Sequence, residues 1–289
     1  MKFPVFYRPT QSVNSNNSYS PSAGKPAKVV RDWKKHFADE IQIRSFGPAT
    51  KDELALAHSY DYVDDVLSCV EPNGFGNRNP DVAKSLRYTV GSMLHASYHV
   101  MKGESPVACS PTSGFHHACY NMGGGYCTFN GLMVTAIAMK LNGHADRILI
   151  LDFDNHHGNG TEDIIAQRDI KYVMNVTNGK QYCNSNEALT LLYNLHNTFF
   201  KDFKPDLVLY QAGADIHIDD PLGGMMTTQD MLLRDLFVFT RCRNAGIPLV
   251  WNLAGGYQRD KRGSIEPVLK LHRQTMEACI GVYSDIGCI

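Results

Sequence analysis

Residues 152–161 read Asp-Phe-Asp-Asn-His-His-Gly-Asn-Gly-Thr and directly follow the apolar run 148–151. In an extended strand alternate side chains point the same way, so Asp152, Asp154 and His156 would share one face. Carboxylate and imidazole groups on one face suit a divalent cation. Alone, such a string is more often a polar loop after a buried strand. Further clusters in the chain favour the metal interpretation.

Asp215 is a third candidate ligand, in the string Gly213-Ala214-Asp215. By itself it would be read as an acid in a loop or at a helix start. A catalytic zinc needs three protein ligands and an open fourth position for water and substrate. Asp154, His156 and Asp215 together supply that set.

Two neighbouring histidines, His116 and His117, follow a glycine. The simpler explanation is a polar loop, or one packed and one exposed imidazole. At a metal site the pair could take a proton from an attacking water and return it to a leaving amine. Asp152 and Asn159 are candidate partners that would orient the two rings.

Two glycine-rich segments complete the set of motifs. In Gly-Gly-Gly-Tyr-Cys at 123–127, the backbone can approach a ligand closely beside an aromatic wall. In Gly-Gly-Tyr at 255–257, the phenol is placed to donate a hydrogen bond to a developing oxyanion. Each run alone is more often a flexible loop.

Predicted strands alternate with predicted helices in the part of the chain that carries these motifs. The apolar strand candidates are 107–109, 147–151, 171–176, 207–211 and 248–253. The helix candidates are 83–101, 131–141, 160–167, 187–202 and 228–245. This order predicts an α/β protein with a central, mainly parallel sheet covered by helices on both faces. Ligands of such sheets lie beyond the carboxyl ends of the strands, where the polar motifs fall.

The composition is that of a globular protein with one sizeable core. The 289 residues are 43% hydrophobic and show no composition break, so we expect a single domain over 1–289. Residues 9–27, rich in Ser, Asn and Pro, are predicted to form a surface loop. The net charge of −1 argues against nucleic acid or an anionic membrane as a primary ligand.

The eight cysteines contain no Cys-x-x-Cys pair, which favours a reducing, cytoplasmic location. The apolar start at 3–7 is too short for the core of a signal peptide, and no uninterrupted apolar run reaches about 18 residues. We therefore expect neither export nor membrane anchoring.

Taken together, the motifs resemble those of the zinc-dependent histone deacetylase family, which includes acetylpolyamine amidohydrolases and acetoin-utilisation proteins. The similarity spans about residues 55 to 260 and keeps the family's order of motifs. The matching segments are Ala57–Val63, Gly114–His117, Gly123–Cys127, Asp152–Gly160, Gly213–Asp215 and Gly255–Tyr257.

The resemblance implies the arginase/deacetylase fold, a single α/β domain with a narrow acyl tunnel that ends at zinc. It implies that Asp154, His156 and Asp215 bind the zinc, with ferrous iron left open as the native metal. It also implies a structural potassium ion, held by backbone oxygens near Asp152, Asp154 and His156 together with Thr177.

The resemblance also implies roles for the other motif residues. His117 would be the general base and acid, and His116 an electrostatic helper partnered by Asp152. Tyr257 would polarise the scissile carbonyl. The implied tunnel residues are Phe115, Gly125, Tyr126 and Leu222.

Within the family, three strings are most similar to the small class IV branch: 123–127, 222–224 and 256–258. Position 159 is Asn where class I members carry Asp. An amide can still orient His117 but should raise its pKa less, which favours a neutral, base-ready imidazole. The acidic rim residue that grips the peptide backbone in class I has no clear counterpart around 71–79.

The predicted function is hydrolysis of an N-acyl amide, most simply N6-acetyl-lysine in a protein or peptide. Acetylpolyamines, other small acetylated amines and longer acyl-lysines stay open as substrates, and the oligomeric state is not predicted. The two-manganese arginase branch is disfavoured, because His217 stands where its second acidic ligand is expected. A catalytically silent binding module should have lost Tyr257, a metal ligand or the histidine pair, and all are present.

Overall fold

The computed structural model describes residues 2–13 and 18–284. Within them, seven strands form one sheet in which all paired strands are parallel, in the order β2-β1-β3-β7-β6-β4-β5. The strands are β1 Phe3–Phe6, β2 Ile41–Arg44, β3 Val107–Ser110, β4 Ile148–Asp152, β5 Val173–Val176, β6 Leu207–Gln211 and β7 Leu249–Asn252. The predicted α/β class with a mainly parallel sheet is confirmed.

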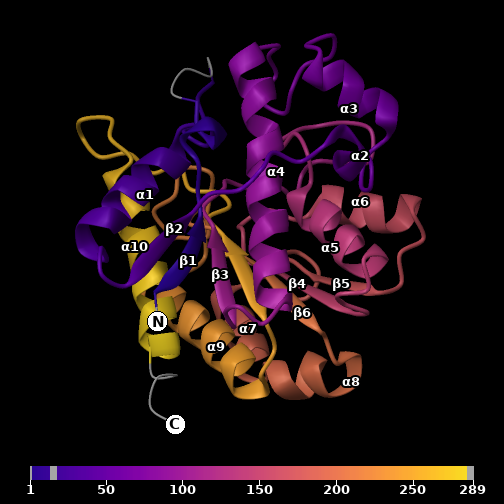
Figure 1. Cartoon of the computed structure of the whole chain (residues 1–289). Helices are drawn as coiled ribbons and strands as arrows, with labels where there is room; N and C mark the ends of the chain where they lie inside the picture. Colours follow the sequence, from indigo (N-terminus) through magenta and orange to yellow (C-terminus); the bar gives the residue numbers. More distant parts are fainter. Residues whose placement is uncertain (1, 14–17, 285–289) are drawn as a thin grey trace.

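Helices cover both faces of this sheet (Figure 1). One face carries α2 Lys51–Leu54, α3 Tyr60–Leu67, α4 Pro80–Met101, α5 Gly131–Leu141 and α6 Asn159–Gln167. The other carries α1 Lys25–His36, α7 Ser185–Tyr193, α8 Lys201–Phe203, α9 Thr228–Ala245 and α10 Glu266–Tyr283. The short helices η1 Pro9–Gln11 and η2 His196–Phe200 complete the elements.

The central strands are buried on both faces, which explains why they lack an in-out alternation of polarity. In β4, Leu149 and Leu151 join the core beneath α9 and α10, and Ile148 and Ile150 join the core beneath α4 and α5. Two hydrophobic cores therefore sandwich the sheet, and polar side chains are left for the ends of the strands.

The strand order decides which loops meet. The strands β3, β7, β6 and β4 are consecutive neighbours in the sheet. Each of them is followed by one of the polar motifs, so the four loops leave the sheet side by side at its carboxyl edge. These four strands therefore position the candidate site.

The helix predicted at 187–202 is broken in the structure. Helix α7 ends at Tyr193 and is followed by the wider turns of η2 and the short α8. The side chain of Asn194 donates to the carbonyl of Thr190, and Thr198 Oγ1 donates to the carbonyl of Asn194, both at 3.0 Å. Such side-chain bonds compete with regular helical geometry, and the apolar spacing does not report them.

The segment 9–27 was predicted as a surface loop, and its residues 14–17 lie outside the described part. Most of its other residues are buried or partly buried. It contains η1 and the first residues of α1, and Gln11, Ser22 and Lys25 are buried. The ammonium of Lys25 donates to the carbonyls of Ala254 and Gly255, at 2.5 and 2.8 Å. The prediction of a surface loop is wrong for these three buried residues, because their polar groups bond to loops far away in the sequence.

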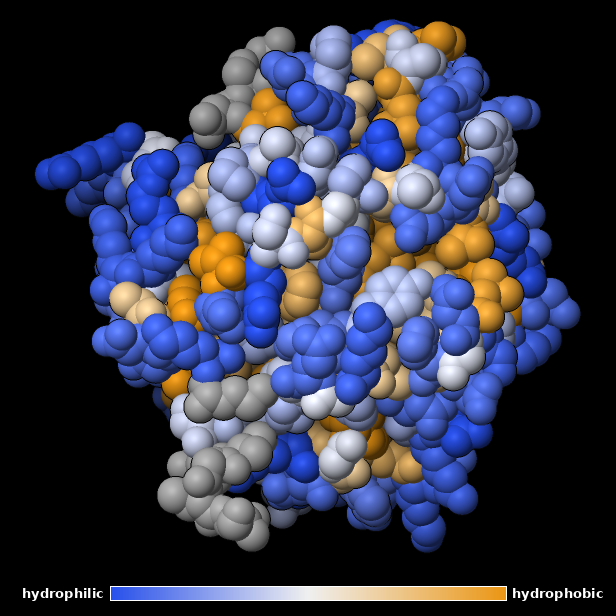
Figure 2. Space-filling model, in the orientation of Figure 1, coloured by the Kyte–Doolittle hydropathy of each residue, from blue (hydrophilic) through white to orange (hydrophobic). Residues whose placement is uncertain are grey.

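Among the described residues, no helix combines the length and apolarity needed to cross a membrane. The face drawn in Figure 2 is mostly hydrophilic, and its hydrophobic residues form small groups divided by polar ones.

Candidate active site

The three predicted metal ligands converge from two loops at the carboxyl edge of the sheet. Asp154 and His156 follow β4, and Asp215 follows β6. One ligand atom from each lies within 4.8 Å of the others. His156 Nδ1 is 3.0 Å from Asp154 Oδ1 and 3.1 Å from Asp215 Oδ2. Both carboxylates are buried and the imidazole is partly exposed, so the cluster is open on one side.

Two buried carboxylates this close require a compensating cation. Burial and the charge of Asp154 raise the pKa of Asp215 to about 7. Burial also opposes ionisation of Asp154, but His116 and His156 hold its pKa well below the usual range. Hydrogen bonds to Asp154 and Asp215 raise the pKa of His156 to about 10. A divalent metal in place of the His156 proton would neutralise the pair more fully, so the donor set fits such an ion.

The loop after β7 closes the ligand cluster from the other side. The backbone N–H of Gly255 donates to Asp154 Oδ2 at 2.9 Å. A Cβ atom at Gly255 would lie only 2.2 Å from Asp215 Oδ2, so the position tolerates no side chain. Gly255 therefore contacts both carboxylates directly.

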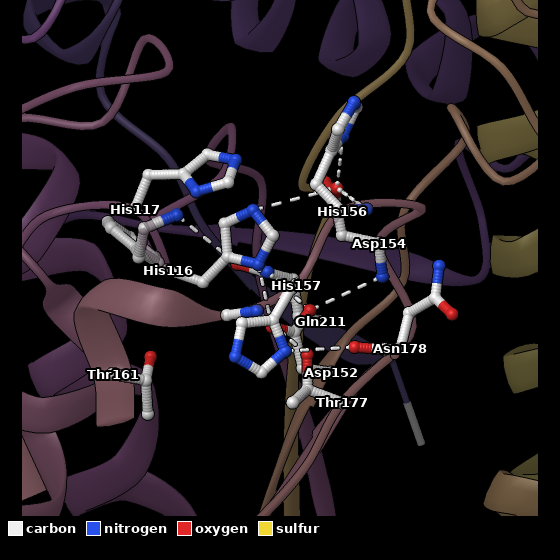
Figure 3. A network of polar contacts seen from close by, with 12 residues as sticks. His116, His117, Asp152, Asp154, His156, His157, Thr161, Thr177, Asn178 and Gln211 are labelled. Atoms are coloured by element: carbon white, nitrogen blue, oxygen red, sulfur yellow. Dashed lines mark hydrogen bonds and ion pairs between the residues drawn. The ribbon is translucent and has the colours of Figure 1, made fainter. Parts of the chain in front are cut away.

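His116 belongs to a buried ionic chain. It is 2% exposed, and its Nδ1 lies 2.7 Å from Asp152 Oδ2. Asp152 also accepts a hydrogen bond from Gln211 Nε2 at 2.7 Å (Figure 3). Burial would lower the pKa of His116, but the charges of Asp152 and Asp154 raise it to about 9. His116 therefore stays an imidazolium at neutral pH.

His117 has a neutral environment. Its Nδ1 lies 2.6 Å from the side-chain oxygen of Asn159, so Nδ1 carries the proton and Nε2 is left as an acceptor. The ring centroids of His116 and His117 are 4.1 Å apart. Burial and the positive charge of His116 lower the pKa of His117. His117 is therefore a neutral imidazole that is ready to take a proton.

Tyr257 completes the neutral side of the site. Burial and the charges of Asp215 and Asp154 raise the pKa of its phenol, which keeps the O–H group as a donor. The ring of Tyr126 lies 5.8 Å from the ring of Tyr257, centroid to centroid. These aromatic rings form walls beside the metal ligands.

A narrow pocket joins both sets of residues. Its lining residues are Ser22, Gly114, His116, His117, Gly125, Tyr126, Cys127, Asp154, His156, Gly255 and Tyr257. Gly125 has a φ of +53°, and a Cβ atom there would lie 2.4 Å from His117 Cδ2. A side chain at Gly125 would therefore displace the imidazole.

The four predicted tunnel residues occupy different places. Gly125 and Tyr126 line the narrow pocket. Phe115 is buried and lines an adjoining cavity of about 40 Å³ that shares Ser22, Gly114 and Tyr126 with the pocket. Leu222 is 40% exposed and lines neither space.

Some contributing residues were missed by sequence reasoning. Ser22 lines the pocket although nothing in the string around it indicates a site. Gln211 is the last residue of the otherwise apolar β6, and a buried amide at the carboxyl end of a strand was a usable signal. Asp220 and His217 lie in the Asp215 loop and contact the residues around Tyr257.

Comparison with known proteins identifies relatives of this chain. The chain is 28% identical to histone deacetylase 2 of Arabidopsis thaliana over 270 residues. This aligned region covers 82% of this chain and 69% of the relative. The chain is 22% identical over 298 residues to a probable deacetylase of Methanothermobacter thermautotrophicus, covering 90% and 87% of the two chains. It is also 30% identical over 209 residues to an uncharacterized protein of Picosynechococcus sp., covering 66% and 69%.

The model of the histone deacetylase domain matches two overlapping stretches, residues 24–176 and 166–268. Together they cover most of the chain and include every residue of the site described above except Ser22. On this match the protein belongs to the histone deacetylase family and is a metal-dependent deacetylase.

Proposed function

We propose that this deacetylase uses zinc to hydrolyse N6-acetyl-lysine side chains in peptides or proteins. The observation that carries the proposal is a single pocket lined by two of the three candidate metal ligands, a neutral His117 and a neutral Tyr257. A narrow pocket suits an extended acyl-lysine stem better than a bulky acyl group. The net charge of −1 supports an acylated substrate over nucleic acid as the partner.

We assign the metal to Asp154, His156 and Asp215, because two carboxylates and one imidazole with an open side suit a catalytic zinc. When bound, zinc supplies Lewis-acid polarisation of the substrate carbonyl and acidifies water. Ferrous iron accepts the same donors, so metal analysis of the isolated protein is part of the test.

In the proposed mechanism, the phenol of Tyr257 donates a hydrogen bond to the substrate carbonyl oxygen, and this bond strengthens as negative charge develops there. Nε2 of His117 takes the proton of the attacking water and returns it to the leaving amine. Burial and the cation on His116, which Asp152 holds, lower the pKa of His117, so the base is unprotonated at rest. Lysine and acetate are the products.

We also propose a structural potassium ion beside the site. It would be held by backbone oxygens near Asp152, Asp154 and His156 together with Thr177, whose Oγ1 accepts the backbone N–H of Gly158 at 2.8 Å and so lies beside the loop that carries the candidate metal ligands. Oxygen donors of this kind suit a hard monovalent cation.

Two finer assignments are also proposals. The class IV branch is supported by the strings at 123–127, 222–224 and 256–258 and by Asn at position 159. A reducing, cytoplasmic location is supported by the free thiols of the cysteines in the described part of the chain.

The test is release of free amine from a matched panel by the zinc-loaded protein. The panel holds an acetyl-lysine peptide, a longer-acyl-lysine peptide and an acetylpolyamine, with His117→Ala as the blank. We expect the acetyl-lysine peptide to have the highest kcat/KM. A preference for the polyamine would reassign the enzyme to small amines, and a preference for the longer chain would reassign its acyl length. No activity above the blank would favour a silent binding module.

A further inference from the structure

The loop that carries Tyr257 adopts an unfavourable backbone conformation. Ala254 has a φ of 52° and Gly256 a φ of 131°, both in the region where side chains are disfavoured. A non-glycine residue at such a φ persists only where surrounding contacts hold it in place. The position of the Tyr257 phenol therefore depends on what holds this loop.

A buried carboxylate from the neighbouring loop holds the backbone of Tyr257. Asp220 is buried, and its Oδ2 accepts the backbone N–H of Tyr257 at 2.8 Å. Its Oδ1 accepts the backbone N–H of Leu222 at 3.0 Å. One side chain thus ties the loop after β7 to the loop after β6.

A buried histidine, His217, holds the next residue of the Tyr257 loop, Gln258. His217 Nδ1 lies 2.9 Å from Gln258 Nε2 and 3.1 Å from the backbone N of Asp219. Both partners are N–H donors, so Nδ1 is the acceptor and Nε2–H donates to Thr228 Oγ1 at 2.9 Å. His217 therefore joins Gln258 to the first residue of α9.

We propose that Asp220 and His217 are positioning residues that set the phenol of Tyr257 over the reacting carbonyl. They act through the backbone of Tyr257 and through Gln258. The inference rests on the proposed role of Tyr257 in catalysis. It gives the segment 215–221 two roles, since the segment supplies a metal ligand at Asp215 and a support for the phenol.

A double-mutant cycle on the zinc-loaded protein, with the acetyl-lysine peptide as substrate, tests this coupling. Asp220→Ala should lower kcat by roughly 10- to 100-fold and change KM by less than about threefold, because a small displacement of an oriented group affects the chemical step. In the Tyr257→Phe background, the same change should alter kcat by less than about twofold, since no phenol is left to position. Zinc content should match the wild type throughout.

Ile218→Ala is the control from the same loop, because that side chain is 58% exposed. It should behave as the wild type. Gln258→Ala is the second variant in case Asp220→Ala does not fold, and it should give a smaller loss of kcat that also vanishes in the Tyr257→Phe background.

An equal loss from Asp220→Ala, or from Gln258→Ala, in both backgrounds would overturn the inference, because it would indicate a general structural effect. A wild-type rate for Tyr257→Phe would overturn the proposed role of Tyr257 and the inference with it. The two failures are therefore distinguishable.

Discussion

The two sides of the site both contain imidazoles but differ in charge. The acidic side consists of Asp152, Asp154, Asp215, His116 and His156, and the neutral side consists of His117, Asn159 and Tyr257. His116 and His117 are adjacent and both are mainly buried, yet the pKa of one is raised to about 9 and that of the other is lowered. Their Nδ1 partners differ, since one is the carboxylate of Asp152 and the other the amide of Asn159.

The difference shows that burial alone does not decide protonation here. On the acidic side, burial strengthens the interactions between opposite charges, and a cation is retained. On the neutral side, the same burial meets no carboxylate partner, and the imidazole and the phenol stay uncharged. The pocket can thus hold a metal and a neutral base close together. The rings of His156 and His117 are 5.8 Å apart, centroid to centroid.

The largest expected effect comes from breaking the acidic side. Asp215→Ala removes one of the three proposed ligands and one of the two buried carboxylates, so the bound zinc should be lost on dialysis and amine release should fall to that of the His117→Ala blank. Zinc is measured by elemental analysis of the dialysed protein. The exposed Asp219→Asn, from the same loop, should keep its metal. Full zinc content in Asp215→Ala would remove that residue from the ligand set.

Removing the phenol from the neutral side should lower activity less than losing the metal does, and the metal should stay bound. Tyr257→Phe removes only the donor to the developing oxyanion, so kcat should fall by on the order of 10²–10³ while zinc content is unchanged. Steady-state kinetics and metal analysis on the same sample check both parts. Near-normal turnover would remove the role assigned to the phenol.

The charge of the acidic side should make metal affinity depend on pH. At the proposed site, zinc would displace the proton of His156, whose pKa is raised to about 10, and below about pH 7 also the proton of Asp215. Affinity should therefore rise with pH, by about tenfold per unit above pH 7 and more steeply below it. Competition with a chelator between pH 6 and 8 measures this slope, and an affinity that does not change with pH would contradict the assignment.

The smallest expected effect comes from a substitution that gives the neutral side a negative charge. Asn159→Asp places a carboxylate at Nδ1 of His117 and should raise the pKa of that imidazole. The acidic limb of kcat/KM against pH should then move to higher pH, by about one unit or less. Asn159→Ala, which adds no charge, is the control. A limb that stays in place or moves to lower pH would exclude His117 as the base that titrates there.

Much of the candidate site was predictable because its motifs are local in sequence. Asp154 and His156 are two residues apart at the end of an apolar run, and His116 and His117 are adjacent. Their contributions to the site follow from strand periodicity and from donor chemistry. Leu222 was grouped with the tunnel by resemblance alone, and it is 40% exposed and does not line the pocket.

The contacts that support the motifs were not predictable in the same way. Lys25 donates to the carbonyl of Ala254 across 229 residues of chain, and Asp220 accepts the N–H of Tyr257 across 37. A lysine in a Ser/Pro-rich segment and an acid before a proline are ordinary surface residues by composition. Their burial depends on which loops surround them.

The sequence by itself determined the chemical groups of the site and the strand ends at which they appear, because strand periodicity and donor type are properties of a few neighbouring residues. Only the tertiary structure decided that β3, β7, β6 and β4 are neighbours, and therefore that the four motifs meet in one pocket. It also decided the charge of each imidazole. Strand order and burial arise from packing between segments far apart in the chain, so no local pattern encodes them alone.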